Sequence, residues 1–269
     1  MPTRLGVAGW PVAHSRSPAM FSAAFAASGL EGWAYQKLPL PPELFTETVR
    51  ALPAAGFAGI NVTIPHKHAA LALADEASDA ALEIGAANTL SFSADGRIAA
   101  ENTDAPGLLA ALGAPLAGLD ALVLGAGGSA RAVVWALARG GARRVMVTNR
   151  TAERARELAD ELGAEAVPGP VAADVLVNCT AVGLGHASSE ARELECLGLS
   201  ADDIRHYRYV VDLVYRDGDT ALARAARAAG ATLVDGLEVL VHQGALSFER
   251  WTGRPAPLAA MSAAARGTP

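Results

Sequence analysis

The stretch Ala121-Leu-Val-Leu-Gly125-Ala126-Gly127-Gly128-Ser129-Ala130 decides the fold of this chain. Its four apolar residues form a candidate buried strand, and the pattern Gly-x-Gly-x-x-Ala then opens an Ala- and Val-rich helix that extends to about Arg139. In that context Gly125 permits a tight turn, Gly127 lets the backbone approach a pyrophosphate, and Ala130 lets the helix pack closely on the sheet. The N–H groups at the helix N-terminus attract phosphate. The pattern predicts a dinucleotide-binding unit, although glycine-rich turns also arise for purely geometric reasons.

The residues after the next predicted strand, Arg144–Asn149, favour NADP(H). An NAD enzyme carries an acidic residue about 20 residues beyond the glycines, for the ribose 2′-hydroxyl. Here the strand ends 24 residues after Gly125 (149 − 125) with Asn149, Arg150 and Thr151, and Arg154 follows one helical turn later. A guanidinium binds a 2′-phosphate in bidentate fashion. The alternative is that both arginines are solvated surface residues and that Thr151 only caps a helix.

Short β-type runs alternate with Ala- and Leu-rich helical runs along most of the chain, which is typical of βαβ units and a parallel sheet. We expect two α/β domains: a substrate-binding domain over residues 1–103 and a Rossmann-type dinucleotide-binding domain over residues 104–235. The C-terminal helices of residues 236–269 are expected to return to the first domain. Strands are predicted at residues 5–8, 34–38, 59–64, 89–92, 98–101, 121–124, 144–149, 174–178, 209–213 and 231–234. Helices are predicted at residues 18–28, 43–52, 66–74, 78–84, 151–162 and 237–251, besides the one that ends near Arg139.

Polar residues gather at predicted strand ends in the first hundred residues. The stretches are His14-Ser15-Arg16-Ser17-Pro18, Asn61-Val-Thr63-Ile-Pro-His66-Lys67, Asn88-Thr89 and Asn102-Thr103-Asp104. Ligands of open α/β sheets bind beyond the carboxyl ends of the strands, so these stretches can converge on one pocket. Hydroxyls, amides, one lysine and one aspartate suit a small polyhydroxylated acid. Each residue alone has a structural explanation, as a helix cap, a turn residue or a solvated side chain.

Composition excludes several classes of protein. The 269 residues are 51% hydrophobic and 19% charged, which allows a sizeable core. The net charge of −6, without a basic stripe, argues against a general nucleic-acid or anionic-membrane binder. Two cysteines give neither a disulfide framework nor a zinc spacing, and the histidines lack a matching acidic or cysteine cluster, so we expect no metal. No signal peptide or membrane-spanning run is evident, and we expect a soluble, cytoplasmic protein.

Taken together, these motifs resemble those of the shikimate dehydrogenase family over roughly residues 4–253. The resemblance rests on the polar stretches above, Gly85-Ala-Ala-Asn88-Thr89, the Gly125 turn, Asn149-Arg-Thr-Ala-Glu-Arg154, Asn178-Cys-Thr-Ala-Val-Gly183, Asp212-Leu-Val-Tyr215 and Gly236-Leu-Glu-Val-Leu-Val-His-Gln243-Gly-Ala245. It implies reversible NADPH-dependent reduction of 3-dehydroshikimate to shikimate in the biosynthesis of chorismate and aromatic amino acids. Separately from the resemblance, we expect a monomer or homodimer.

The resemblance also assigns the site residues. Lys67 and Asp104 would form the catalytic pair, and which of the two transfers the proton stays open. The other substrate-binding residues would be Ser15, Ser17, Thr63, Asn88, Tyr215 and Gln243. The cofactor would contact Gly125, Ala126, Gly127, Gly128, Ser129, Asn149, Arg150, Thr151, Arg154, Leu213 and Gly236, with Asp79 as a further contributor.

Two other functions remain open at this point. A quinate or broad-specificity dehydrogenase would keep the same fold and the same catalytic pair. Several positions depart from the family pattern, which leaves the discrimination between shikimate and quinate undetermined: Phe21, Ser22, Ala87, Leu213, Asp217 and Val239. A non-catalytic NADP-binding sensor is the other alternative, and the presence of both Lys67 and Asp104 argues against it.

Overall fold

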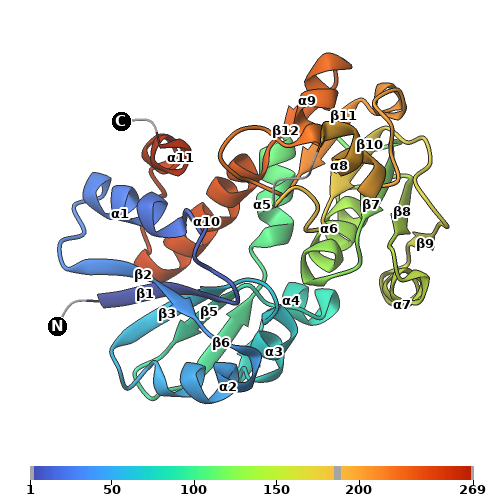
Figure 1. Ribbon diagram of the computed structural model, residues 1–269. Coiled ribbons are helices and arrows are strands. Elements are labelled where there is room, and N and C mark those ends of the chain that lie inside the picture. Colours follow the sequence, from blue (N-terminus) through green and yellow to red (C-terminus); the bar gives the residue numbers. More distant parts are fainter. Residues whose placement is uncertain (1–2, 185–188, 268–269) are drawn as a thin grey trace. The chain divides into compact units, whose positions relative to one another are not determined.

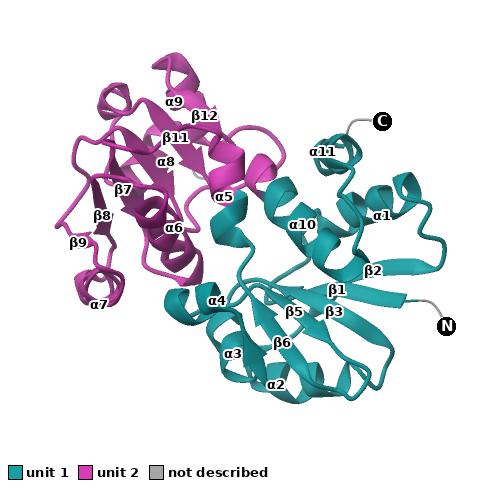
Figure 2. Ribbon diagram, turned by 180° about the vertical axis from the view of Figure 1, so that it is seen from behind, with its two compact units in different colours: residues 1–107, 240–269 teal, residues 108–239 magenta. Residues whose placement is uncertain are grey.

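The computed structural model describes residues 3–184 and 189–267 (Figure 1). The chain divides into two compact units, one formed by residues 1–107 and 240–269 and the other by residues 108–239 (Figure 2). Both divisions fall inside helices, α5 (Asp104–Leu112) and α10 (Gly236–Thr252). The predicted domain boundaries, after residues 103 and 235, lie where these two helices begin.

The first unit is built on a six-stranded sheet in the order β2-β1-β3-β5-β6-β4. Strand β1 runs parallel to β2 and β3, whereas β5 runs antiparallel to both β3 and β6. The expectation of a parallel sheet therefore fails at β5, because five residues connect β5 to β6 and so short a link can join only antiparallel neighbours. The strands are β1 (Thr3–Gly9), β2 (Trp33–Pro39), β3 (Phe57–Val62), β4 (Glu76–Ala77), β5 (Thr89–Phe92) and β6 (Ile98–Glu101).

Helices cover this sheet around a core of Phe45, Ile60 and Leu90, all fully buried. They are α1 (Ser17–Ala27), α2 (Pro42–Ala51), α3 (Lys67–Ala72), α4 (Asp79–Ile84) and α11 (Leu258–Arg266), together with most of α10. Helix α1 begins at Ser17, one residue before the predicted start at residue 18, and Arg16 is its N-cap. The Ala-rich segment after Gly253 forms α11, which lies beside α1.

The second unit has the strand order of a Rossmann-type dinucleotide-binding fold. Its six strands follow the order β12-β11-β10-β7-β8-β9, and every neighbouring pair is parallel. Strand β7 is buried along its whole length, as expected of a strand covered on both faces. The strands are β7 (Asp120–Leu124), β8 (Arg144–Thr148), β9 (Glu165–Ala166), β10 (Val175–Asn178), β11 (Tyr209–Asp212) and β12 (Thr232–Val234). The expected α/β fold class is confirmed.

The helices of this unit, besides the greater part of α5, are α6 (Gly128–Arg139), α7 (Ala152–Leu162), α8 (Glu190–Cys196), the 3₁₀ helix η1 (Asp203–His206) and α9 (Ala221–Ala228). The sequence analysis predicted no helix where α5 forms. Pro106 lies in the first turn of α5, where its missing N–H costs no intrahelical hydrogen bond, and the Gly107 N–H donates to the Thr103 carbonyl at 3.0 Å. The Asn102 side chain accepts a hydrogen bond from the Ala105 N–H at 3.2 Å and so stabilises the start of α5.

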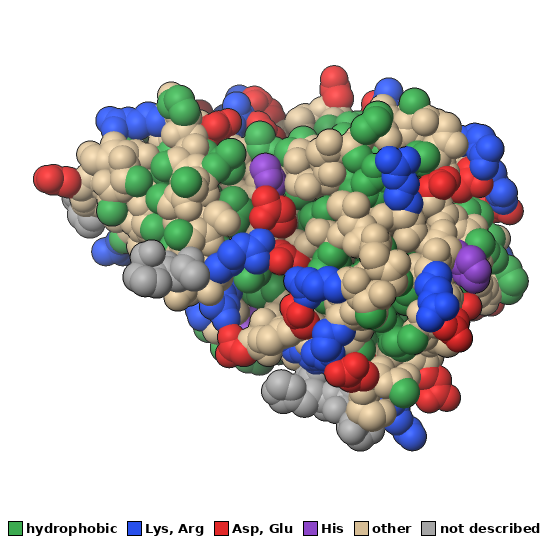
Figure 3. Space-filling model, turned by 90° about the horizontal axis from the view of Figure 1, so that it is seen from above, with side chains coloured by type: hydrophobic (Ala, Val, Ile, Leu, Met, Phe, Trp, Pro, Cys, Tyr) green, Lys and Arg blue, Asp and Glu red, His purple; other side chains and the backbone are tan. Residues whose placement is uncertain are grey.

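On the face drawn in Figure 3, basic and acidic side chains are interspersed. Within residues 3–184 and 189–267, no helix has the length and apolar character needed to cross a bilayer.

Gly59 of β3 provides the space in which α10 meets the sheet. Trp251 of α10 donates from Nε1 to the Leu90 carbonyl at 3.3 Å, and a Cβ on Gly59 would lie only 2.3 Å from that nitrogen. We expect Gly59→Ala to displace Trp251 and to lower the free energy of unfolding by ~1–3 kcal/mol, as overpacking does. Thermal unfolding checks this against Gly169→Ala, where the added Cβ meets nothing within 4 Å. Equal melting temperatures for the two variants would contradict the role of Gly59.

His66 makes the stability of the first unit sensitive to pH. The residue is 2% exposed, and its ring stacks on Phe45 at 4.3 Å and donates from Nε2 to the Leu40 carbonyl at 2.7 Å. Burial lowers the pKa of His66 below its ordinary value. The unfolded chain therefore binds a proton below about pH 6.5 that the folded chain rejects, and folding stability falls as the pH drops towards the folded-state pKa.

We expect His66→Gln, which keeps a donor for Leu40, to flatten this dependence by up to about 1.4 kcal/mol per pH unit. Urea unfolding of the parent and the variant is measured at a series of pH values. The series runs from about 4.5, above most carboxylate pKa values, to about 8, where histidine is neutral. Parallel curves would show that His66 does not titrate on unfolding.

Candidate active site

Lys67 and Asp104 form a short ion pair at the edge of the first sheet. Lys67 Nζ lies 2.7 Å from Asp104 Oδ2, and the two side chains are 9% and 20% exposed. Each is the first residue of its helix, α3 and α5 respectively. A helix N-terminus favours the aspartate and disfavours the ammonium, so Asp104 compensates for a cation placed at the wrong end of α3. The sequence prediction that these two residues meet is matched by this geometry.

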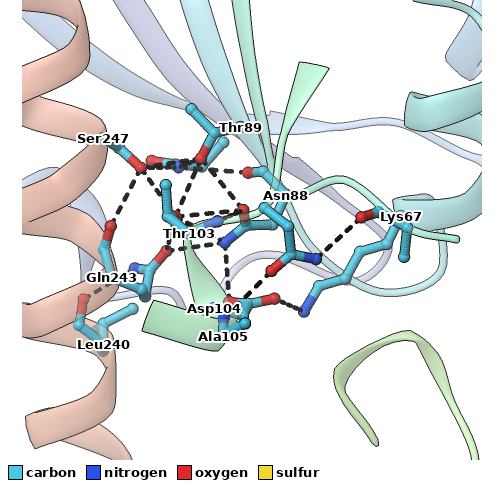
Figure 4. A network of polar contacts seen from close by, with 12 residues as sticks. Lys67, Asn88, Thr89, Thr103, Asp104, Ala105, Leu240, Gln243 and Ser247 are labelled. Carbon is cyan, nitrogen blue, oxygen red and sulfur yellow. Dashed lines mark hydrogen bonds and ion pairs between the residues drawn. The ribbon is translucent and has the colours of Figure 1, made fainter. Parts of the chain in front are cut away.

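Asn88 fixes the orientation of Asp104. Its Nδ2 donates to Asp104 Oδ1 at 2.8 Å and to Thr103 Oγ1 at 3.0 Å, and its Oδ1 accepts from the Thr103 N–H at 2.7 Å. Both carboxylate oxygens of Asp104 thus have a donor, one from Lys67 and one from Asn88 (Figure 4). Because Asn88 uses its donors and its acceptor, its amide has one orientation, and the ion pair is held in one geometry.

Gln243 joins the same group of residues from α10. Its Oε1 lies 3.2 Å from Asn88 Nδ2, and its Nε2 donates to the Leu240 carbonyl at 2.8 Å. In Figure 4 Gln243 and Ser247 reach the network from one side and Lys67 reaches it from the other. A Cβ on Gly107 would lie 2.7 Å from the Gln243 backbone, so the glycine of α5 is needed for this approach. Lys67, Asn88, Asp104 and Gln243, all predicted site residues, are therefore linked through hydrogen bonds.

A second layer of this network contains Asn61 and Thr89, from the polar stretches quoted above, together with Tyr35 and Ser247, which the sequence analysis missed. Asn61 Nδ2 donates to Ser247 Oγ at 2.8 Å and to Thr89 Oγ1 at 3.1 Å, and Asn61 Oδ1 accepts from Tyr35 at 2.7 Å. Ser247 Oγ also lies 3.3 Å from Thr103 Oγ1. The available signal was the spacing of Gln243 and Ser247, because two polar residues four positions apart share one face of a helix.

Ser15, Ser17 and Thr63 follow the neighbouring strands β1 and β3. Ser15 Oγ accepts from the Ser17 N–H at 3.3 Å, and both serines are buried. The loops after the two strands are joined where the Trp10 N–H donates to the Ile64 carbonyl at 2.9 Å. Because β1 and β3 are parallel, the loops that carry these hydroxyls leave the sheet at the same edge.

The turn between β7 and α6 has the features of a phosphate-binding loop. Gly125 has φ +107°, and a Cβ there would lie 3.2 Å from the Cys179 backbone, so a larger residue is excluded. Gly127 is the N-cap of α6 and, having no side chain, leaves the first N–H groups of the helix without a side-chain cap. A Cβ on it would meet nothing within 4 Å. The backbone N–H groups of Gly128 and Ser129 follow at the helix N-terminus. The loop therefore fits a dinucleotide pyrophosphate in both space and polarity.

The tip of β8 carries the predicted 2′-phosphate residues. Asn149 donates from Nδ2 to the Thr151 carbonyl at 2.9 Å, which closes the turn into α7. Arg150, Thr151 and Arg154 are exposed, and Thr151, as the N-cap of α7, makes no side-chain capping bond. The guanidiniums and the hydroxyl therefore fit an anionic ligand.

The remaining predicted residues are distributed between the two units. Leu213 and Tyr215 follow β11 in the second unit, next to Asp212, whose pKa is raised by burial although Thr220, Val214 and Asn178 donate hydrogen bonds to it. Gly236 is the first residue of α10. A Cβ on it would lie 2.6 Å from the Leu213 carbonyl, so Gly236 and Leu213 are adjacent. Asp79 is exposed at the start of α4, which belongs to the first unit, whereas the glycine turn belongs to the second. The role of Asp79 in cofactor binding stays a prediction. Within the described part of the chain, no three His, Cys, Asp or Glu side chains are grouped as metal ligands.

Family profiles match most of the chain. Residues 7–90 match the shikimate dehydrogenase substrate-binding domain, residues 109–189 match shikimate/quinate 5-dehydrogenase, and residues 236–266 match the shikimate 5′-dehydrogenase C-terminal domain. The shikimate dehydrogenase (NADP(+)) of Anaeromyxobacter sp. strain K is 49% identical over 277 residues, which cover 96% of this chain and 94% of that protein. The enzyme of the same name from Methylobacterium radiotolerans is 46% identical over 269 residues, which cover 93% and 91%.

Solved structures agree with these relatives. Shikimate 5-dehydrogenase from Thermus thermophilus, in complex with NADP(H) and shikimate, has a TM-score of 0.88 and 44% identity, covering 98% of this chain and 99% of that chain. The ligand-free 5-ketofructose reductase of Gluconobacter sp. strain CHM43 has a TM-score of 0.83 and 29% identity, covering 99% of both chains. The two sheets, the Lys67–Asp104 pair and these matches lead to one conclusion: the chain belongs to the shikimate dehydrogenase family.

Proposed function

We propose that this protein is an NADP-dependent shikimate dehydrogenase, which interconverts 3-dehydroshikimate and shikimate reversibly in aromatic biosynthesis. The observation that carries the proposal is the 2.7 Å Lys67–Asp104 pair, held by Asn88 at the sheet edge where the hydroxyls of Ser15 and Thr63 also lie. The relatives named shikimate dehydrogenase (NADP(+)) support it over nearly the whole chain. The test is the absorbance of NADPH formed from shikimate and NADP⁺, and the absence of any such absorbance would refute the proposal.

Substrate binding uses side chains that offer hydroxyls, amides and charge. The family resemblance assigns the substrate to six side chains: Ser15, Ser17, Thr63, Asn88, Tyr215 and Gln243. Lys67 and Asp104 face the reacting oxygen. This assignment suits an acid with several hydroxyl groups, because each hydroxyl can both donate and accept and so needs partners of both kinds.

Proton management falls to the ion pair. The nicotinamide, when bound, supplies the hydride that reduces the ketone carbon. Lys67 Nζ donates a proton to the ketone oxygen as it becomes an alcohol, and it takes that proton back when the alcohol is oxidised. Asp104 Oδ2 accepts a hydrogen bond from Nζ at 2.7 Å and so holds the ammonium in place.

The second unit supplies the cofactor site in this proposal. The backbone from Gly125 to Ser129 binds the pyrophosphate, and the 2′-phosphate is bound by Asn149, Arg150, Thr151 and Arg154. Leu213 and Gly236 are also assigned to the cofactor, and Asp79 is retained as a weaker candidate. Space beside Gly127 and the absence of a side-chain cap on α6 support this assignment.

A second candidate is a dehydrogenase of wider substrate range. It is favoured by the likeness to a 5-ketofructose reductase at 29% identity and by a profile that names both shikimate and quinate. Comparing kcat/KM for shikimate, quinate and the reduction of 5-ketofructose separates the two functions. We also infer a cytoplasmic protein that is a monomer or homodimer, which sedimentation and cell fractionation test.

The Lys67→Ala variant tests the catalytic role. Proton delivery matters mainly in the transition state, so we expect kcat to fall by ~10²–10⁴-fold while the KM for shikimate changes much less. Arg97→Ala, which removes a cation from an exposed ion pair with Glu76 in the same unit, is the control and should retain the parental kcat. Near-normal kcat with a raised KM in Lys67→Ala would make Lys67 a binding residue only.

The arginines after β8 are tested by the choice of cofactor. One or two charge-assisted contacts of ~1.5–3 kcal/mol each favour NADP⁺ over NAD⁺ by roughly tenfold to several-hundred-fold. We expect Arg150→Ala combined with Arg154→Ala to remove most of that preference in kcat/KM. Arg156→Ala, on the same helix and in an exposed pair with Glu153, should leave it intact. A preference unchanged by the double substitution would show that these arginines do not bind the phosphate.

A further inference from the structure

A buried ion pair anchors the residue that follows Tyr215. Arg216 Nη2 lies 3.1 Å from Glu193 Oε2, and the two side chains are only 13% and 4% exposed. Glu193 is on α8, whereas Arg216 is on the segment between β11 and α9, residues 213–220, which we call the Tyr215 loop. Charges so far from water are tolerated only where further hydrogen bonds satisfy their remaining donors and acceptors.

Those further hydrogen bonds connect three parts of the second unit. Arg216 donates from Nη1 to the Gly183 carbonyl at 2.9 Å and from Nη2 to the Asp219 carbonyl at 3.0 Å. Glu193 Oε1 accepts from the Ala221 N–H, at the start of α9, at 2.6 Å. The pair therefore holds the Tyr215 loop at two points and joins it to the loop after β10 and to α8.

The other side of Tyr215 is fixed as well. Asp212 accepts a hydrogen bond from the Val214 N–H at 3.2 Å through Oδ1, and one from the Thr220 hydroxyl at 2.6 Å through Oδ2. Asp217, Gly218 and Asp219 are exposed, and Gly218 has φ +79°. The outer part of the Tyr215 loop is thus exposed to solvent, while Arg216 on one side of it and Thr220 on the other are held by Glu193 and Asp212.

We propose that Arg216 and Glu193 are positioning residues, which hold Tyr215 in its substrate-binding position before the substrate arrives. The inference rests on the proposed function, in which Tyr215 contacts shikimate. A loop that is already ordered loses less conformational entropy when the ligand binds, so the anchor acts on substrate affinity. Arginine suits the task because its planar fork reaches Glu193, Gly183 and Asp219 together, which an ammonium cannot do.

Four variants separate this role from a merely structural one. We expect Arg216→Met to raise the KM for shikimate by about 10- to 100-fold, the effect of losing one substrate hydrogen bond, with a smaller change in kcat. Arg216→Lys keeps the charge but not the fork and should give an intermediate KM. Glu193→Gln keeps an acceptor for the Ala221 N–H and should also raise KM. Arg205→Met removes an exposed ion pair with Asp202 in the same unit, and its kinetics should equal the parent's.

The decisive measurement is a double-mutant cycle with Tyr215→Phe. If Arg216 acts through Tyr215, removing the tyrosine hydroxyl from the Arg216→Met protein changes KM by less than twofold, about the error of such cycles, although it changes KM strongly in the parent. Effects that multiply independently, or an unchanged KM in Arg216→Met, overturn the inference. If Arg216→Met does not fold, as judged by circular dichroism, the same cycle is run with Arg216→Lys and Glu193→Gln.

The outcome is distinguishable from failure of the proposed function. A parent enzyme that forms no NADPH from shikimate refutes that function, while an active parent with no coupling between positions 215 and 216 refutes only the positioning role.

Discussion

An ion pair that is largely removed from water needs protein groups to replace its hydration, and this constraint organises the first unit. Lys67 and Asp104 satisfy part of each other's demand, but Asp104 needs a second donor, which Asn88 provides. Asn88 can provide it only if its own amide is held, and Thr103 and Gln243 complete its bonding. Thr103 is in turn hydrogen-bonded to Ser247, and Asn61 donates to both Ser247 and Thr89. Lys67 and Asp104 are therefore held by a chain of neutral groups that extends into the core.

The same constraint explains why the C-terminal segment belongs with the first sheet. Gln243, Ser247 and Trp251 are spaced four apart and share one face of α10, so a single helix supplies a site residue, a bridging hydroxyl and an anchoring ring. Two glycines make that contact possible: Gly107 admits the Gln243 backbone, and Gly59 admits the Trp251 ring. Packing of α10 and geometry of the site are consequently one structural feature, and a substitution that moves the helix moves Gln243 with it.

The second unit solves a different problem, which is to present backbone N–H groups to a phosphate. The parallel strand order brings the loops after β7 and β10 together at the point where the order reverses, and Gly125 lies directly against the Cys179 backbone there. Charge enters this unit in two ways. Arg150 and Arg154 are exposed and suited to a ligand, whereas Arg216 is buried against Glu193 and orders the chain. The three arginines are chemically identical, and only burial and hydrogen bonding distinguish their roles.

The sequence alone determined the fold class, the dinucleotide turn and most of the polar residues around the Lys67–Asp104 pair. These depend on local features: hydrophobic alternation, glycines between a strand and a helix, and polar stretches at strand ends. It did not reveal that β5 is antiparallel, which places Asn88 before its strand and yet at the edge where β3 and β6 end. Nor did it reveal Tyr35, Ser247, Glu193 or Arg216, whose partners lie 26, 186 and 23 residues away along the chain (61 − 35, 247 − 61 and 216 − 193). A hydrogen bond or a buried ion pair between such distant residues has no local pattern, because its partner is chosen by the packing of helices and sheets and not by the neighbouring sequence.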